Sequence, residues 1–173
     1  MNERTLSQKI FFILVAASLL SVFSGCGSVQ HSVDFQKDYM PKTGMKIEVG
    51  PVMNETGQKF DVEIEEMLAT ALVERLQDEE LLCTGKEGSK LVTNCIIREY
   101  KKGDAFKRWV MPGWGSTVLT VQCDLMDGNI GVGIVNARRT VDAGGAYTVG
   151  AWANVFKRIA EDIVGDLRDR IKN

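Results

Sequence analysis

The sequence predicts an α+β fold, a two-layer sandwich in which a mixed, mostly antiparallel sheet of about five strands carries two amphipathic helices on one face. Several segments alternate apolar and polar side chains with a period of two, which is typical of half-buried strands. Two longer segments, residues 61–80 and 151–172, repeat apolar side chains at helical spacing. The order of the segments, a strand and a helix followed by a run of strands and a last helix, favours a sheet covered on one face.

The first half of the domain is predicted to contain a strand, a helix and a second short strand. Residues 46–53 alternate like a strand, and residues 54–57 are typical of a turn. The helix over 61–80 has Asp61 as its expected N-cap. Residues 81–83 then form the short strand, and the crossover through the helix allows the two strands to be parallel.

The second half is predicted to form three antiparallel strands and a long helix. Residues 90–100, 116–126 and 130–141 are strand-like, and Asp127-Gly128 is typical of a tight hairpin between the last two. The helix over 151–172 keeps one face apolar, while its polar face mixes both signs of charge. We therefore expect this helix to pack on the sheet and not on a membrane.

The N-terminus is typical of an export signal. The apolar run over residues 10–23 is too short to span a bilayer, and Ser24, Gly25 and Cys26 follow it. This ending resembles the lipobox of bacterial lipoproteins, which implies cleavage before Cys26 and acylation of its thiol and of the new amino group. The alternatives are an uncleaved signal anchor and a soluble exported protein that is cleaved elsewhere.

This resemblance sets the expected boundaries and location. We expect a signal peptide over residues 1–25, a lipidated cysteine and flexible tether over 26–44, and an α+β periplasmic domain over 45–173. The tether is polar and shows no clear periodicity, as flexible linkers do. Gly27 is not the Asp that is associated with retention in the inner membrane, so the resemblance implies an outer-membrane lipoprotein facing the periplasm. Acyl chains on Cys26 would bind it to that membrane almost permanently.

The composition excludes several functions. The 173 residues carry a net charge of −2, which argues against a nucleic-acid partner. The single histidine, His31, lies in the expected tether, and the chain has no C-x-x-C pair and no G-x-S-x-G motif. We therefore expect no enzymatic activity, no cofactor and no metal site.

Three cysteines remain beyond Cys26, namely Cys83, Cys95 and Cys123. An odd number cannot pair completely within one chain, although the oxidising periplasm permits one disulfide. Cys95 and Cys123 share strand parity with apolar neighbours. The favoured interpretation is that they are small buried side chains with free thiols.

The connection over residues 101–115 is the candidate contact surface. It is long for a compact domain and combines basic with aromatic side chains, of which Lys107, Arg108, Trp109 and Trp114 are the candidate partner-binding residues. The expected partner is an envelope protein, with anionic headgroups or glycan as alternatives. In a competing interpretation, the two tryptophans fold back to cap the sheet and the lysines face solvent.

Other charged groups are expected to be solvated. Arg138 and Arg139 are adjacent in a predicted strand, so they face opposite sides, and we expect them at a solvated edge. The acidic clusters at residues 63–66 and 78–80 flank the first helix and are expected to be exposed helix ends.

Several short motifs together resemble an uncharacterised family of bacterial lipoproteins, domain of unknown function 4410. They are the first strand, the Asn54–Gly57 turn, the helix after it, Gly113-Trp114-Gly115, Asp127-Gly128, Gly144-Gly145 within a loop over 143–150, and the last helix. More distantly, the pattern is similar to the amino-terminal domain of the Tol translocation protein and to periplasmic domains of curli-secretion lipoproteins and of lipoprotein activators of penicillin-binding proteins. The resemblance implies an envelope location and protein–protein contact, and offers no catalytic residues.

Together these features predict a membrane-anchored lipoprotein whose periplasmic domain binds an envelope partner without catalysis. One alternative is a subunit of an outer-membrane secretion or assembly complex. The other, which the lack of a convergent polar set disfavours, is an enzyme acting on cell-wall or lipid substrates.

Overall fold

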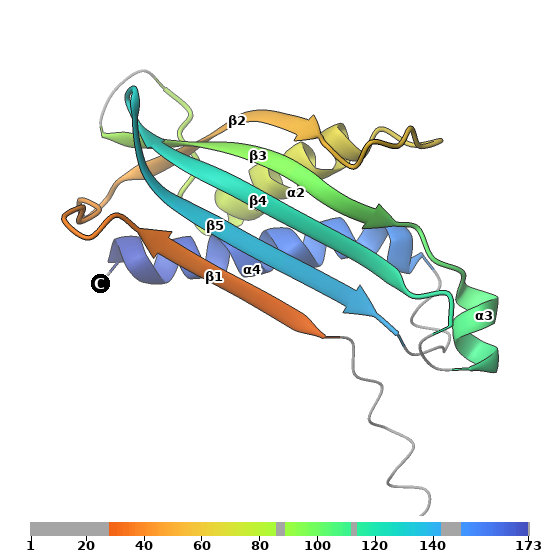
Figure 1. Ribbon diagram of the computed structural model, residues 1–173. Coiled ribbons are helices and arrows are strands. Elements are labelled where there is room, and N and C mark those ends of the chain that lie inside the picture. The colour runs from red at the N-terminus through yellow and green to blue at the C-terminus, as the bar shows by residue number, and fades with distance from the viewer. Residues whose placement is uncertain (1–27, 86–88, 112–113, 143–149, 173) are drawn as a thin grey trace, which may run out of the picture.

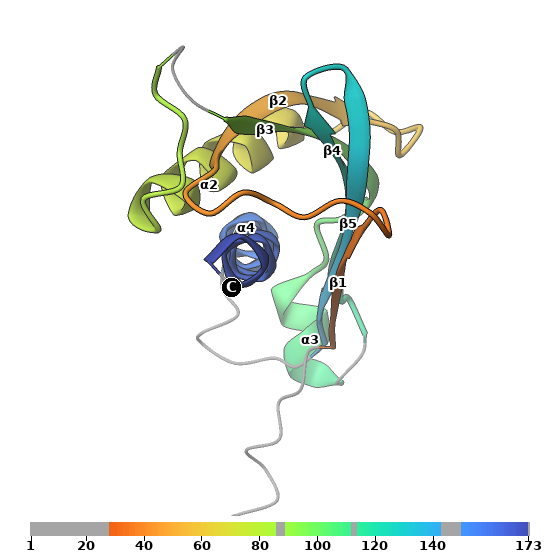
Figure 2. The same ribbon diagram turned by 90° about the vertical axis from the view of Figure 1, so that its left-hand side faces the viewer.

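A five-stranded sheet with two long helices on one face forms the body of the computed structural model, which describes residues 28–85, 89–111, 114–142 and 150–172 (Figure 1). The strand order is β1-β5-β4-β3-β2. The elements are β1 (Val29–Phe35), β2 (Lys46–Asn54), α2 (Ile64–Asp78), β3 (Lys90–Lys101), α3 (Ala105–Val110), β4 (Thr117–Asp127), β5 (Ile130–Val141) and α4 (Ala151–Lys172). Figure 2 looks along α4 and shows α2 and α4 on the same, concave side of the sheet. The predicted α+β sandwich is confirmed.

The pairing of the strands is mixed, as expected. The crossover β2-α2-β3 joins two parallel strands, and β3, β4, β5 and β1 pair antiparallel in turn. The short strand predicted at residues 81–83 is wrong. Leu82 makes only an isolated parallel bridge to Ile47, held by two backbone hydrogen bonds, which is too little pairing to form a strand.

The tether expected over residues 26–44 needs a larger correction, because it contains β1. This strand pairs with β5 along its whole length, from Val29 opposite Arg139 to Phe35 opposite Gly133. The sequence does not predict this strand, because Val33 is its one buried residue and five of its seven residues are exposed. β1 is an edge strand, and an edge strand needs few apolar side chains. The folded body therefore includes residues well before 45, while Cys26 and the signal peptide lie outside the described residues.

The core fills the space between the concave face of the sheet and the two helices. Helix α2 contributes Leu68, Leu72 and Leu76, and α4 contributes Ile159 and Ile163, each no more than 1% exposed. Helix α4 begins and ends where the sequence predicted, and its apolar face packs on the sheet as expected. Burying a Leu or Ile side chain stabilises a fold by roughly 1.5–3 kcal/mol, so this layer is the main source of stability.

Helix α2 begins later than predicted, and its expected cap is wrong. Glu63 occupies the N-cap position and makes no capping hydrogen bond through its side chain. Asp61 instead accepts a hydrogen bond from the ammonium of Lys102 at 2.7 Å. The Lys102 ammonium lowers the pKa of the Asp61 carboxyl, first through this hydrogen bond and then through its charge. Because Lys102 directly follows β3, Asp61 links the segment before α2 to the end of β3 and does not cap the helix.

The two predicted tight turns are confirmed. In the turn after β2, the Asn54 side-chain oxygen accepts from the backbone amide of Thr56 at 3.0 Å, and Gly57 has a positive φ of 73°. In the β4–β5 hairpin, Asp127 lies opposite Ile130, and Gly128 has a φ of 61°, which favours glycine. Of the predicted loop over 143–150, all but Gly150 lies outside the described residues.

Candidate docking surface

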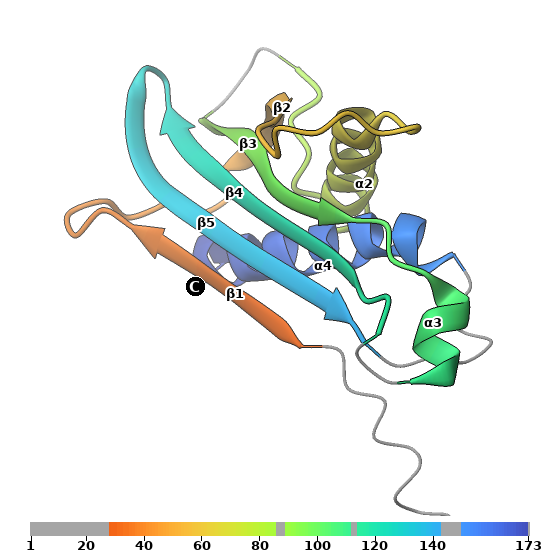
Figure 3. The ribbon, with the colours of Figure 1, turned by 45° about the vertical axis from the view of Figure 1, so that its right-hand side comes forward.

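The candidate surface is built on α3, a short helix within the connection that joins β3 to β4. Asp104 caps the helix: its carboxylate accepts from the backbone amides of Phe106 at 2.9 Å and Lys107 at 3.1 Å. This arrangement satisfies amides that a helix start otherwise leaves unpaired. The segment predicted as a loop is therefore an ordered projection at one end of the sheet (Figure 3).

Arg108 holds this projection from inside, which corrects its assignment as a partner-binding residue. Its side chain is 2% exposed and donates to the Gly115 carbonyl at 2.8 Å and to the Thr117 hydroxyl at 2.9 Å. The Thr117 hydroxyl donates in turn to the Lys102 carbonyl at 2.9 Å. We call Arg108 and Thr117 the arginine clamp. The clamp ties the end of α3 to the start of β4 and the end of β3.

Gly103 lets the chain approach the clamp closely. It has a φ of 68°, and a Cβ at this position would lie 2.6 Å from both the Arg108 guanidinium and the Thr117 hydroxyl. No other residue type fits such a space without moving the clamp. The sequence shows the glycine but not the side chains of Arg108 and Thr117 that fill the space beside it.

Large apolar side chains cover the outside of the projection. We call them the aromatic tip: Phe106 (69% exposed), Trp109 (70%), Val110 (53%), Met111 (56%) and Trp114 (51%). The competing interpretation, in which the tryptophans fold back to cap the sheet, is therefore wrong. The rings of Phe106 and Trp109 lie 6.2 Å apart, so these two exposed rings contact each other.

One basic side chain lies beside the aromatic tip, and two more lie behind it. The exposed Lys107 ammonium lies 5.8 Å from the centre of the Trp114 ring, within reach of a cation–π interaction. Behind the tip, the Lys102 ammonium lies 5.0 Å from the centre of the Trp152 ring, and Lys101 pairs with Glu99 at 2.7 Å. Of the four candidate residues, Lys107, Trp109 and Trp114 are exposed, whereas Arg108 is buried beneath them.

Arg138 and Arg139 face opposite sides of β5, as predicted, but they do not lie at a solvated edge. β1 covers the edge of β5. On the open face, Arg138 donates to Glu99 at 2.5 Å, and the hydrogen bond from Lys101, followed by that from Arg138, lowers the pKa of the Glu99 carboxyl. On the helix-covered face, Arg139 donates twice to Asp162 of α4, at 2.6 and 2.7 Å. This pair holds α4 against the sheet, and the hydrogen bond to Asp162 raises the pKa of Arg139.

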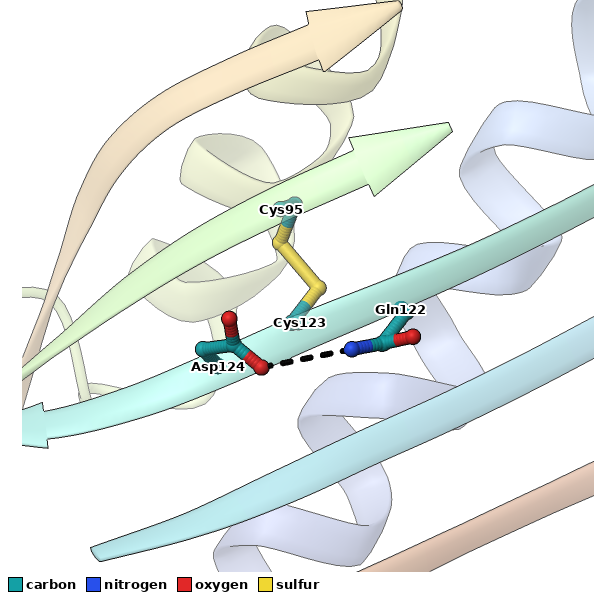
Figure 4. The surroundings of a disulfide bond; sticks show 4 residues. All are labelled: Cys95, Gln122, Cys123 and Asp124. Atoms are coloured by element: carbon teal, nitrogen blue, oxygen red, sulfur yellow. Dashed lines mark hydrogen bonds between the residues drawn. A yellow bond between two sulfur atoms is a disulfide. The ribbon is translucent and has the colours of Figure 1, made fainter. Parts of the chain in front are cut away.

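Cys95 and Cys123 form a disulfide, which corrects the expectation of free thiols. The two residues lie directly opposite each other in β3 and β4, with their Cα atoms 4.0 Å apart, and both are fully buried (Figure 4). Strand parity predicted the burial, but the pairing depends on the register between two strands, which parity within one strand does not give. Cys83 is a free, half-buried thiol that donates to the Gly85 carbonyl at 3.2 Å.

Within the described residues, no group of three or more His, Cys, Asp or Glu side chains is arranged to hold a metal ion. The ring of His31, predicted to lie in a tether, is hydrogen bonded to Asp166 of α4 at 2.7 Å. The acidic cluster at residues 78–80 is partly structural, because Glu79 pairs with Arg75 and Arg168. Across the same described ranges, no helix is long and apolar enough to cross a membrane.

Comparison with known proteins places the chain in a fold class and not in a family. No family model matches it, and no curated protein does. Solved structures do share its architecture. The PelC dodecamer of Paraburkholderia phytofirmans has a TM-score of 0.56 at 13% identity, covering 83% of this chain and 98% of that one. A second dodecamer structure, of a PelC point variant, gives 0.54 at 14% identity with the same coverage.

A Xanthomonas campestris protein of domain of unknown function 330 has a TM-score of 0.46 at 12% identity, covering 78% of this chain and 90% of that one. At such identities, the PelC comparisons show a shared fold alone. The resemblance to domain of unknown function 4410, to the Tol translocation protein and to the curli-secretion lipoproteins stays a prediction.

Proposed function

We propose that this chain is a non-catalytic lipoprotein of the bacterial cell envelope, anchored through acyl chains on Cys26, whose folded domain docks on an envelope component through the aromatic tip. The lipobox-like sequence before Cys26 supports the anchor. Gly27 supports the outer membrane as the destination. PelC, which shares this fold, forms a dodecamer, and this supports a domain that contacts other proteins.

One observation carries the docking surface. Five large apolar side chains, each at least half exposed, lie close together in the chain: three on the six-residue helix α3, one at its C-cap and one, Trp114, shortly after it. An exposed apolar cluster of this kind typically marks an interaction site on a soluble domain. Here the cluster is also held in place, because the buried Arg108 and the Asp104 cap fix the helix that carries it. A surface that is both apolar and rigid binds with little loss of side-chain freedom.

The anchor is tested by the mass of the mature chain. We expect a product that begins at Cys26 and carries diacylglyceryl and amide-linked acyl groups, recovered with outer membranes. The Cys26→Ser variant should lose these groups and leave the membrane fraction. A mature chain that retains residues 1–25, or that carries no acyl groups, would remove the anchor from the proposal.

The docking surface is tested by photo-crosslinking in the intact envelope. A photoreactive amino acid at position 109 should give a crosslink to an envelope component, protein or lipid. The same amino acid at position 130 is the control, because Ile130 is 67% exposed in the β4–β5 hairpin at the other end of the sheet. Equal crosslinking from both positions would contradict a specific role for the tip.

A second candidate function is a subunit of a ring or secretion complex. The observation that favours it is that the PelC structures with this fold are dodecamers and match over 98% of their own length. Native mass spectrometry of the detergent-solubilised chain should then show a closed oligomer. A monomer at all concentrations, with the lipid attached, would exclude this candidate and leave the first one standing.

A further inference from the structure

We infer that the aromatic tip rests on the surface of the bilayer in which Cys26 is anchored, so that lipid headgroups, and not a protein, are the component it docks on. This inference rests on the proposed acylation of Cys26. The tip is assigned to a lipid surface because β1 begins close to Cys26 and at the same end of the sheet as α3.

The first described residues leave the sheet at the α3 end. Val29 opens β1 opposite Arg139 of β5, and Arg139 lies opposite Leu119 near the start of β4. The carbonyl of Ser28 accepts from the Thr140 amide at 3.0 Å, which fixes the chain one residue earlier. Because α3 directly precedes β4, the N-terminal end of β1 and the aromatic tip project from the same end of the body (Figure 3).

Only a short piece of chain separates the acylation site from this end. Cys26 is three residues before Val29, and three extended residues span at most about 11 Å. Neighbouring strands lie about 4.8 Å apart, so β1 and β4 are roughly 10 Å apart across β5. An acylated Cys26 at headgroup level therefore holds the α3 end of the sheet close to the bilayer. A flexible tether over residues 26–44 would have allowed the folded body any orientation on the membrane. Because β1 begins at Val29, only a few residues remain between Cys26 and the sheet.

The chemistry of the tip suits this position. Tryptophan is enriched where the hydrocarbon core meets water, because its ring is apolar and its N–H needs a polar partner. The tip presents Trp109 and Trp114 beside Phe106 and Met111, all about half exposed or more. Lys107 lies over Trp114, where a long basic side chain can keep its charge among anionic headgroups while its methylenes cover the ring. Exposed apolar rings beside a lysine suit the chemistry of an anionic membrane surface.

The test uses the two tip tryptophans as depth reporters in the complete acylated protein. The protein is reconstituted in vesicles of phosphatidylethanolamine and phosphatidylglycerol that contain a dibrominated phosphatidylcholine, which quenches tryptophan fluorescence on contact. We expect the fluorescence of Trp109 and Trp114 to be quenched at least two-fold, with emission shifted to shorter wavelength. The double variant Trp109→Phe/Trp114→Phe should lose this quenching, since Trp152 alone remains.

The matched control moves a reporter to the far end of the same body. In the double variant, Ile130→Trp places an exposed tryptophan in the β4–β5 hairpin, and we expect no quenching from it. Acylation and flotation with the vesicles are measured on the same samples. If the protein is acylated and floats, but the tip tryptophans are no more quenched than the hairpin reporter, the inference is wrong while the proposed anchor stands. Tip crosslinks to a protein, with unquenched tryptophans, would assign the surface to that protein. A chain without acyl groups would overturn the anchor and the inference together.

Discussion

Arg108 has a different role in the structure from the one that the sequence predicts. In the sequence it lies between a lysine and a tryptophan in a basic, aromatic segment, and arginine in such a setting is typical of an interface. In the structure it is buried and donates to Gly115 and Thr117. The same segment thus divides into an outer surface, with Lys107, Trp109 and Trp114, and an inner support.

Replacing Arg108 should destabilise the fold, whereas replacing its exposed neighbour should not. Arg108→Ala leaves the Gly115 carbonyl and the Thr117 hydroxyl without this donor in a buried site, so we expect a loss of about 2 kcal/mol in the free energy of unfolding. Lys107→Ala, the control, should change it by less than about 0.5 kcal/mol. Urea denaturation followed by circular dichroism measures both. Equal effects of the two substitutions would contradict the clamp.

The disulfide gives a second prediction at this scale. Cys95 and Cys123 are 28 residues apart, and closing a loop of that length stabilises a fold by roughly 3 kcal/mol through the unfolded chain. The Cys95→Ala/Cys123→Ala variant should lose most of this stability, and a reducing agent should lower the melting temperature of the natural chain alone. With Cys26 acylated as proposed, thiol titration of the unreduced, denatured chain should detect only Cys83. Three reactive thiols would show that the pair does not form.

The elements show which parts of the fold the sequence can predict. The sequence predicts helix α4 and strands β3, β4 and β5 closely, because each is long; α4, β3 and β4 also repeat their buried side chains regularly. Strand β1 is hard to predict because Val33 is the one buried residue along it. The exposure of the aromatic tip cannot be predicted, because the spacing of Trp109 and Trp114 in the sequence does not show whether their rings turn toward the sheet or toward solvent. The register that places Cys95 opposite Cys123 is also not predictable from either strand alone, since it depends on how β3 and β4 pair.

Amide exchange should distinguish β1 from a flexible tether. Peptides covering residues 29–35 should exchange slowly, because this strand is hydrogen bonded to β5. Val33→Asp places a charge at a buried position and should speed exchange in β1, with a loss of about 1–3 kcal/mol. Gln30→Asp, on the exposed part of the same strand, is the control and should leave the protection intact. Fast exchange throughout 29–35 in the natural chain would show that the segment is unpaired.

At the scale of the whole molecule, the buried Tyr100 and the half-buried Tyr39 make stability depend on alkaline pH. Tyr100 packs between Phe60 and Phe156 and donates to the Trp152 carbonyl at 3.1 Å. Burial, with a smaller effect from the charge of Asp61, raises its pKa to about 12. Burial also raises the pKa of Tyr39 to about 12, helped by its hydrogen bond to Asp127.

Both folded-state values lie above the value near 10 of an unfolded tyrosine, so folding favours the neutral hydroxyl. This contribution is complete below pH 10 and is lost as the pH rises from about 10 to about 12. For Tyr100 we expect a loss on the order of 1–3 kcal/mol. Urea denaturation between pH 8 and 11.5 measures it, and Tyr100→Phe should reduce the slope above pH 10. An unchanged slope would mean that this hydroxyl ionises equally in both states.

The early start of β1 also limits where such a molecule can work. With Cys26 acylated as we propose, three residues would join the folded body to the membrane, and the body could not move far from the bilayer surface. Whatever it meets must come to within one body width of the membrane, as a neighbouring lipoprotein or an integral protein does. A partner fixed to the cell wall or to the opposite membrane would need a segment of its own long enough to extend to this body.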